Sequence, residues 1–594
     1  MTPLATVSLS SLDWAIVFVF FAIAIAIGIW TSKKAGRSET DFFLGGRNMP
    51  WWLLGFSMVA TTFATDTPNL VTDIVRKDGV AGNWQWWAFL LTGMLTVFIY
   101  AKLWRRSGVA TDLEFYELRY SGKPAAFLRG FRALYLGVVF NIMVMATVSL
   151  AAIKIGGIML GLEPWECLLY SALVTLIFSC LGGLRGVLLT DFILFLMAMV
   201  GSVAAAYFAL GHDAVGGMGG LLEKFESKGL SEKLRIFPSP DDPSVFVGLF
   251  IIPLAVQWWS VWYPGAEPGG GGYLAQRMLA AKNENHALGA TLFFNVAHYA
   301  IRPWPWIIVA LCSLLVFPDL ASMEKAFPDA QKVEEDSAYS AMLTFLPAGW
   351  LGLVLTSLIA AYMSTISTHL NWGSSYVVND FYARFIKPEA SSKELVWVGR
   401  LSTVVMMILA GVIALMMKDA LTSFRIILQI GAGTGLLFIL RWFWWRINAW
   451  SEITAMTVSF LIAIILAGND DLAGHHKLII GVAVTTVSWI VVTLLTRPDH
   501  HATLRNFIEV TNPGGKGWKK VHEAAEAEGS PITPKDSSVN LPRGILCMVF
   551  GCFAIYGFLF ATGYFLYREY TTAITLSLLS AIGFGVLYLN IQRK

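Results

Sequence analysis

The sequence is dominated by apolar stretches of about 20 residues, each long enough to cross the hydrocarbon core of a bilayer as an α-helix. Of its 594 residues, 56% are hydrophobic and only 14% are charged, against about a quarter charged in soluble proteins. Inside a bilayer every backbone polar group must be bonded within the protein, and helices of this length achieve that. We therefore predict an all-α polytopic membrane protein with about 15 transmembrane spans.

The expected spans are apolar segments separated by polar ones. They cover residues 12–31, 51–75, 84–104, 133–160, 165–181, 186–210, 244–281, 287–317, 347–378, 397–417, 421–444, 449–467, 476–496, 543–567 and 571–590. Basic side chains gather in alternate loops, around residues 33–47, 105–132, 384–393 and 516–520. The positive-inside rule assigns these loops to the cytoplasm. We expect a multi-pass protein of the inner or plasma membrane, with its N-terminus outside and its C-terminus inside.

Two of the spans contain runs that a continuous helix cannot accommodate. The first is the polar run T-T-F-A-T-D-T-P-N at 61–69, and the second is W-Y-P-G-A-E-P-G-G-G-G-Y at 262–273. Proline removes a backbone donor, and four successive glycines unwind the chain. Non-helical backbone at membrane depth survives only where it lines a cavity or is buried in protein. An ordinary kink would explain Pro68 but not the second run.

Each break opens a group of five spans, and the two groups start on opposite sides of the membrane. This arrangement is typical of inverted-repeat transporters, whose binding site lies at the two breaks. We therefore divide the chain into an N-terminal span with its loop (1–50), a first repeat (51–210), an outer loop (211–243), a second repeat (244–444), two further spans (445–496), a cytoplasmic loop (497–541) and two C-terminal spans (542–594).

The helix expected over residues 349–382 carries a dense group of hydroxyl side chains in an otherwise apolar segment. Ser364, Ser367 and Thr368 fall on one face, and Ala361 and Thr365 fall on a neighbouring line, because positions three and four apart share a helix face. Buried hydroxyls need partners. Contacts between helices are one interpretation, and ligands for a small dehydrated cation are the other.

Four segments carry a resemblance to a known family. They are G-G-R-N-M-P-W-W-L-L-G-F-S-M-V-A-T-T (45–62), L-G-G-L-R-G-V-L-L-T-D (181–191), Y-L-A-Q-R-M-L-A-A-K (273–282) and the hydroxyl-rich helix. In order and spacing they resemble the solute:sodium symporter family over most of residues 12–444. The resemblance implies a LeuT-type fold of five-plus-five inverted repeats with extra flanking helices. The glycine-rich insertion at 269–272 departs from the family's sugar and proline transporters.

The resemblance also implies the coupling ion, Na⁺, and its ligands. A first sodium site corresponds to the carbonyl groups of Ala60, Phe63 and Ala361 and the hydroxyl groups of Ser364 and Thr365. Some members have a second sodium site, which here corresponds to Asp191, Ser364, Ser367 and Thr368. A carboxylate within a span is a functional candidate. The alternative for Asp191 is an interfacial carboxylate that pairs with Arg185.

By the same resemblance the solute lies against the two breaks. The expected contacts are polar side chains near those breaks: Thr62, Asp66, Thr67, Asn141, Ser260, Tyr263 and His298, with Gln257, Arg302 and Gln429 as weaker candidates. Such side chains suit a ligand that bears hydroxyl groups. Alternatively, Asn141 and His298 bond only to backbone carbonyl groups. Arg302 favours a carboxylate ligand if it faces the cavity, and forms a structural pair near Pro303 if it does not.

We therefore expect a sodium-coupled secondary active symporter that imports a sugar or polyol by alternating access. An amino acid or organic acid is the alternative solute, and a sensor that uses the 497–541 segment is a more remote alternative. We do not expect an enzyme, because the sequence contains none of the H-E-x-x-H, C-x-x-C, G-x-S-x-G or P-loop patterns. The net charge of +3 gives no reason to expect a nucleic-acid partner, and the expected partners are a small solute and the lipid bilayer.

Overall fold

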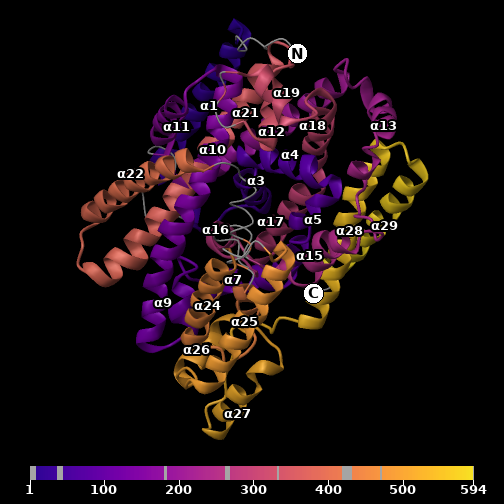
Figure 1. Ribbon diagram of the computed structural model, residues 1–594. Coiled ribbons are helices and arrows are strands. Elements are labelled where there is room, and N and C mark those ends of the chain that lie inside the picture. The colour runs from indigo at the N-terminus through magenta and orange to yellow at the C-terminus, as the bar shows by residue number, and fades with distance from the viewer. Residues whose placement is uncertain are drawn as a thin grey trace.

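The computed structural model describes the whole chain except residues 1–8, 36–43, 180–182, 261–267, 329, 331–332, 418–427, 429–430, 432, 468–470 and 593–594 (Figure 1). The regular secondary structure of the described residues is helical, without a β-strand; one isolated bridge joins Met49 to Ala281. Eleven helical runs among them are long and apolar enough to cross a membrane. Each coincides with one of the expected spans, so the prediction of an all-α polytopic protein is confirmed. In the expected span 421–444, residues 421–427, 429–430 and 432 lie outside the described residues.

The helices of the first half are α1 (Ser11–Ala35), α3 (Trp51–Thr61), α4 (Asp66–Asp78), α5 (Trp84–Trp87), α6 (Leu90–Leu95), α7 (Ala101–Ser107), α8 (Glu114–Arg119), α9 (Gly122–Leu134), α10 (Asn141–Leu160), α11 (Pro164–Ser179), α12 (Gly183–Gly211), α13 (Gly217–Ser227), α14 (Pro243–Phe246), α15 (Ile252–Ala255) and α16 (Gly272–Ala280). Those that follow are α17 (Glu284–Val296), α18 (Pro303–Val316), α19 (Leu320–Ala326), α20 (Ala338–Leu343), α21 (Trp350–Ser375), α22 (Ser392–Met416), α24 (Ala449–Ala467), α25 (Gly474–Leu495), α26 (His501–Thr511), α27 (Lys519–Ala527), α28 (Leu541–Leu566) and α29 (Tyr570–Gln592).

Short 3₁₀ and π segments extend or join these helices. The 3₁₀ segments are η1 (Gly45–Arg47), η2 (Val80–Asn83), η5 (Ser231–Leu234), η7 (Gln257–Trp259), η9 (Glu335–Ser337) and η11 (Lys516–Trp518). The π segments are η3 (Thr96–Tyr100), η4 (Tyr135–Phe140), η6 (Val247–Ile251), η8 (Ala297–Ile301) and η10 (Tyr376–Ile386). A π segment widens one helical turn, and such segments often occur at functional sites.

Both predicted breaks are present. Helix α3 ends at Thr61 and α4 begins at Asp66, so the polar run separates two short helices. The second break lies between η7 and α16, and residues 261–267 within it are outside the described part of the chain. Gly269 and Gly270 have φ angles of 84° and 91°, a conformation that favours glycine.

The glycine run of the second break is held against α7 and the segment between α7 and α8. The carbonyl group of Gly269 accepts a hydrogen bond from Trp104 Nε1 at 2.7 Å, and the amide of Gly272 donates to Asp112 Oδ2 at 2.7 Å. A Cβ atom at Gly270 would collide with Met278 and would crowd Trp104. The insertion therefore lets the unwound backbone approach the neighbouring helix closely.

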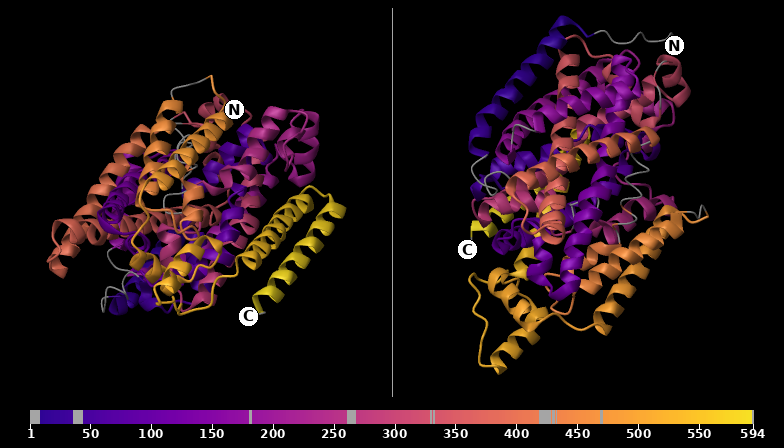
Figure 2. Two further views of the ribbon diagram at one scale, coloured as in Figure 1. Left: turned by 90° about the horizontal axis from the view of Figure 1, so that it is seen from below. Right: turned by 90° about the vertical axis from the view of Figure 1, so that its left-hand side faces the viewer.

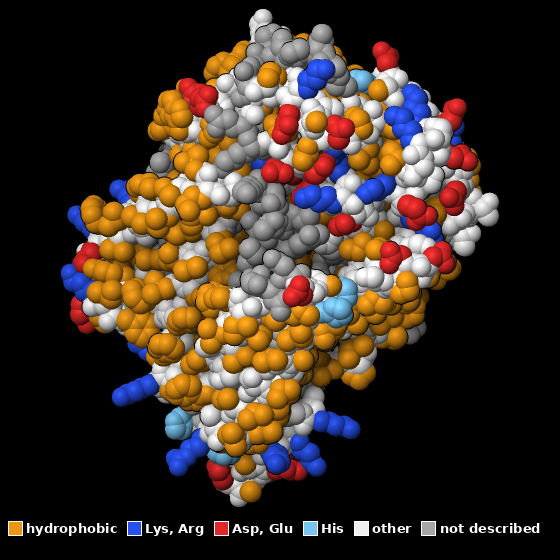
Figure 3. All heavy atoms as spheres, viewed as in Figure 1, with side chains coloured by type: hydrophobic (Ala, Val, Ile, Leu, Met, Phe, Trp, Pro, Cys, Tyr) orange, Lys and Arg blue, Asp and Glu red, His pale blue; other side chains and the backbone are white. Residues whose placement is uncertain are grey.

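The broken helices lie in the middle of the bundle, and other helices surround them. Helix α3 packs against α12, α17 and α21, and α4 packs against α18. Helices α28 and α29 form a hairpin at one edge of the molecule (Figures 1 and 2). In Figure 3 hydrophobic side chains cover much of the left and lower-middle parts of the face, whereas charged side chains gather at its upper right, its lower end and its left edge. Large apolar side chains such as Phe18, Ile408 and Leu578 are more than half exposed, as a lipid-facing surface requires.

The segment 497–541, expected to be a loop, contains two packed helices. Arg119 of α8 lies over the rings of Phe507 in α26 and Trp518 in η11, 5.4 and 4.9 Å from their centroids. Its Nε also donates to the carbonyl group of Arg441 at 2.8 Å, and Trp518 Nε1 donates to that of Trp442 at 3.0 Å. A buried guanidinium between aromatic rings is a strong contact, so this segment is part of the fold rather than a linker.

A substitution at Gly517 tests whether the segment 497–541 is packed against the rest of the protein. A Cβ atom there would overlap the carbonyl oxygen of Phe443. We expect Gly517→Ala to weaken the docked segment, lowering the free energy of unfolding by about 1–3 kcal/mol and exposing residues 497–541 to protease. Thermal unfolding and limited proteolysis would measure both effects.

Gly585→Ala is the matched control, because nothing lies within 4 Å of a Cβ atom at that position. Equal protease resistance of the Gly517→Ala variant and the unchanged protein would contradict the docked arrangement.

Candidate cation and solute sites

One buried carboxylate joins three helices in the middle of the bundle. Asp191 of α12 is 1% exposed. Its Oδ2 accepts a hydrogen bond from Ser57 Oγ of α3 at 2.6 Å, and its Oδ1 accepts one from Ser364 Oγ of α21 at 2.5 Å. The structure thus brings together Asp191 and Ser364, as expected, and adds Ser57. Ser57 was not among the residues predicted from the sequence. Two features could have identified it: it carries a hydroxyl group, and it lies one turn before Ala60 in a segment that resembles the family.

A buried arginine lies beside this junction. Arg277 of α16 is 1% exposed, and its Nε and Nη2 donate to Ser57 Oγ at 3.4 and 3.3 Å. Its charge and that of Asp191 attract each other. The guanidinium near the carboxylate therefore belongs to Arg277, on the far side of the second break, whereas the sequence suggested Arg185.

The first break packs against the hydroxyl-rich helix. Thr365 Oγ1 donates to the carbonyl oxygen of Thr61 at 3.4 Å, and Thr65 Oγ1 donates to that of Leu358 at 2.9 Å. Ala361 and Thr365 are fully buried. The carbonyl oxygen of Ala60 accepts from the amide of Phe63 at 3.0 Å. The two segments expected to form the first sodium site are therefore neighbours. The hydroxyl group of Ser364, however, donates to Asp191.

The oxygen atoms near Asp191 are those that a hard cation takes. Ser367 Oγ donates to the carbonyl group of Ser364 at 3.1 Å. Thr368 Oγ1, one turn from Ser364, is buried and has no hydrogen-bond partner among the described residues. A carboxylate with several hydroxyl oxygens, one of them unsatisfied, fits a sodium ion.

A second cluster lies where the first break meets η8. Arg302 Nη1 donates to the carbonyl oxygen of Thr62 at 2.7 Å, and its Nη2 lies 2.5 Å from His298 Nδ1. That histidine nitrogen is also 3.1 Å from Thr62 Oγ1. Thr67 Oγ1 donates to the same Thr62 carbonyl group at 3.1 Å. The structure therefore brings together four of the expected solute residues, with Arg302 bonded to the unwound backbone.

One carboxylate oxygen of Asp66 is buried without a hydrogen-bond donor among the described residues. It begins α4, and its Oδ1 is buried and has no hydrogen-bond partner among the described residues. The positive charge of Arg302 lies near enough to attract it. An unsatisfied buried carboxylate oxygen is costly, and a ligand hydroxyl group would satisfy it.

The other expected solute residues are placed differently. Asn141 is fully buried; its Nδ2 donates to the carbonyl group of His369 at 2.7 Å, and its Oδ1 pairs with His369 Nδ1. Gln257 Nε2 donates to the carbonyl group of Gln85 at 2.5 Å. Ser260 Oγ is buried and unpaired among the described residues. Asn141 is thus bound to α21, while Tyr263 and Gln429 lie outside the described residues.

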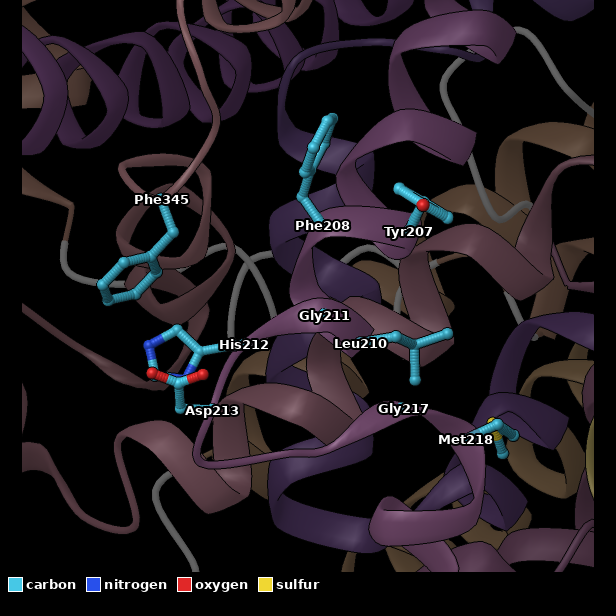
Figure 4. Close-up of a pocket in the computed structure, with 9 residues that line it drawn as sticks. All are labelled: Tyr207, Phe208, Leu210, Gly211, His212, Asp213, Gly217, Met218 and Phe345. Atoms are coloured by element: carbon cyan, nitrogen blue, oxygen red, sulfur yellow. The ribbon is translucent and has the colours of Figure 1, made fainter.

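Two cavities open at the end of the molecule that carries α13. One of about 940 Å³ runs between α4, η5, α14 and α25 and includes Gln85 and Gln257, so it reaches the second break. The other, of about 600 Å³, is lined by the end of α12, the start of α13 and Phe345, and its His212 faces Phe345 (Figure 4). Of these two cavities, the first is lined by one residue expected to bind the solute, Gln257.

Broken helices that meet a buried acid and a row of hydroxyl groups define the class: an ion-coupled membrane transporter. Its family follows from sequence, because the profile of the Sodium:solute symporter family matches residues 42–459, more than half of the chain. The chain belongs to that family, and it is a sodium-coupled solute symporter, not an enzyme.

Individual relatives agree with this assignment. The chain is 26% identical to the Sodium/glucose cotransporter of Vibrio parahaemolyticus over 77% of its own length and 85% of that protein. It is 27% identical to Sodium/myo-inositol cotransporter 2 of Oryctolagus cuniculus over 78% of its own length and 71% of that protein. Its fold matches a substrate-bound, outward-open Na⁺-coupled sialic acid symporter with a TM-score of 0.65 and 19% identity, covering 83% of this chain and 99% of that one.

Proposed function

We propose that the chain imports a neutral, polyhydroxylated solute, a sugar or polyol, by alternating access coupled to sodium. The observation that carries this proposal is the contact between the unwound residues 61–65 and the hydroxyl-rich helix α21. Such a contact couples solute and ion, because both bind to the same interrupted helix. The sugar and inositol transporters among its relatives support the same solute class.

The proposed architecture is a LeuT-type five-plus-five inverted repeat over 51–210 and 244–444, with about fifteen spans in all. The end that carries α13 and α19 is outside, and the end that carries α26 and α27 is cytoplasmic, as the basic loops indicate. The protein lies in an inner or plasma membrane. The large cavity at the α13 end is then the outer approach to the second break.

We propose two sodium sites that share α21. The first uses the carbonyl groups of Ala60, Phe63 and Ala361 with Ser364 and Thr365, and the second uses Asp191 with Ser364, Ser367 and Thr368. Ser57 holds the Asp191 carboxylate in place from the side of α3. Because α3 belongs to the first repeat and α21 to the second, sodium between them favours one arrangement of the two repeats over the other.

The solute class follows from the cluster at the first break. Arg302 is already bonded to the Thr62 carbonyl group and to His298, so its charge is directed at the protein rather than at a ligand carboxylate. Asp66 presents an unsatisfied acceptor, which suits a hydroxyl donor and repels an anion. An organic acid or amino acid is the alternative solute, and it requires Arg302 to leave Thr62.

Sodium coupling is tested at Asp191. Without the carboxylate, the second site loses its charged ligand. We expect Asp191→Asn to reduce the sodium Hill coefficient of uptake from about two to about one, measured with labelled solute in proteoliposomes.

Asp241→Asn, an exposed substitution in the outer loop, is the matched control and should leave the Hill coefficient unchanged. A Hill coefficient that is the same in Asp191→Asn and the unchanged protein would remove the second sodium site from the proposal.

The solute site is tested at Asp66. A hydrogen bond to a charged acceptor contributes about 1.5–3 kcal/mol, so Asp66→Asn should raise the KM for the solute about tenfold or more and leave the sodium Hill coefficient as it was. A thermal-shift screen of sugars, polyols, amino acids and acids, with and without sodium, would identify the solute.

In that screen we expect neutral polyols or sugars to raise the Tm only when sodium is present. Stabilisation by carboxylates alone, abolished in Arg302→Gln, would instead establish the organic-acid alternative.

A further inference from the structure

A small cavity of about 220 Å³ lies at the end of the molecule that we propose to be cytoplasmic. Its lining includes the segment between α7 and α8, the last turn of α21, the start of η10 and Gly272, which is the first residue of α16 after the second break. None of the described residues of the proposed sodium and solute sites lines it. Its volume is below the roughly 300 Å³ at which ligand pockets begin, so we interpret it as a vestibule rather than a binding site.

The carboxylate of Asp112 joins three parts of the chain at this cavity. Its Oδ2 accepts a hydrogen bond from the amide of Gly272 at 2.7 Å, and its Oδ1 accepts one from the hydroxyl group of Tyr376. Asp112 is 8% exposed and Tyr376 is 1% exposed. Hydrogen bonds to a carboxylate are stronger than those between neutral groups, and the N-terminus of α16 favours a negative charge beside it. The segment between α7 and α8, the second break and the cytoplasmic end of α21 therefore share one carboxylate.

A second buried carboxylate attaches η10 to α9 and to the segment between α7 and α8. Asp380 is fully buried, and its Oδ1 accepts hydrogen bonds from Thr111 Oγ1 at 3.3 Å and from Arg129 Nε at 2.7 Å. Arg129 Nη1 also donates to Glu117 Oε2 at 2.6 Å. These contacts do not involve α16. If α16 separates from η10, Asp112 must therefore lose either Gly272 or Tyr376, while the contacts of Asp380 can remain.

Two π segments meet beside this carboxylate. Tyr376 is the first residue of η10, and it packs closely on Gly137 of η4, where an added Cβ atom would lie 3.0 Å from the Tyr376 side chain. Helices kink at π segments, and such segments often occur at functional sites. The hydroxyl group of Ser364 and the other proposed sodium ligands of α21 precede η10 in the chain. The cytoplasmic end of this helix can therefore bend without displacing those ligands.

We propose that Tyr376, Asp112 and the amide of Gly272 form the cytoplasmic gate of the transporter, an inference that rests on the alternating access proposed above. The gate is closed in this structure, because Asp112 holds α16 against η10. When the Tyr376 hydroxyl group leaves the carboxylate, α16 moves away from η10 and the second break opens into the cavity. Solute and sodium then leave by this route. Tyr376 is thus a positioning residue, which acts on the second break through Asp112 and does not bind the solute.

The experiment measures how accessible the cavity is in the full-length chain. Asn379→Cys places a thiol at a half-buried position of the cavity lining. Inside-out membrane vesicles present the proposed cytoplasmic face to a membrane-impermeant maleimide. Tyr376→Phe keeps the aromatic ring and removes the hydroxyl group that donates to Asp112. Because the closed state loses a hydrogen bond to a carboxylate, we expect the thiol to be labelled about tenfold faster in this variant.

Tyr382→Phe is the matched control. It removes a hydroxyl group from the same π segment, but that group donates to Glu394 Oε1 at 2.7 Å, so the labelling rate should not change. Leu249→Cys, in the lining of the large outer cavity, reports on the opposite side in right-side-out vesicles. We expect Tyr376→Phe not to accelerate its labelling, because an inward opening does not widen the outer approach. Each rate is compared with that of the same variant without the added cysteine.

Two outcomes would overturn the proposal. One is equal labelling of the inner thiol in Tyr376→Phe and Tyr382→Phe, and the other is equal acceleration at both thiols in Tyr376→Phe, which indicates general loosening of the fold. Asp112→Asn should also accelerate labelling of the inner thiol, and it decides the matter if Tyr376→Phe does not fold.

The result is separable from the proposed function. Labelling needs neither sodium nor solute, so it can succeed or fail independently of the proposed solute class and sodium sites. Labelling of Asn379→Cys in right-side-out vesicles alone would contradict the proposed membrane orientation, and with it the assignment of this gate to the cytoplasm.

Discussion

The structure depends on one buried carboxylate, Asp191 of α12, which interacts with residues of three other helices. Asp191 has two hydroxyl donors, Ser57 and Ser364, and the charge of Arg277 nearby. A carboxylate at membrane depth is expensive to bury. It is stabilised only while α3, α12, α16 and α21 keep their present places. Their relative positions are therefore linked to whatever balances this charge, which we propose to be a sodium ion.

The same helices position the proposed solute site, so the proposal links ion and solute through the first break. Residues 61–65 contact α21 on one side, and Thr62 contacts Arg302 and His298 on the other. A displacement of the unwound backbone would change both sets of contacts together. The glycine run bound to Trp104 and Asp112 gives the second break a similar attachment to its neighbours.

Much of the fold could be predicted from apolar length and from residues that interrupt helices. The eleven long helices and both breaks follow from those two signals, which are local. The contacts of Asn141 with His369 and of Arg277 with Ser57 join residues more than 200 positions apart, and local patterns do not report them. The packed helices of 497–541 were missed because their anchor, Arg119, lies on a distant helix. The family resemblance placed Asp191 and Ser364 in the same site, whereas the contact between Ser57 and Asp191 became evident only from the three-dimensional structure.

The central claim is that residues 57–65, Asp191 and residues 361–368 together hold sodium. Equilibrium binding of radioactive sodium to the purified chain tests it most directly, with potassium and choline as competitors. We expect saturable binding of about two ions per chain that neither competitor displaces. Absence of saturable binding, or displacement by potassium as effective as that by unlabelled sodium, would contradict it.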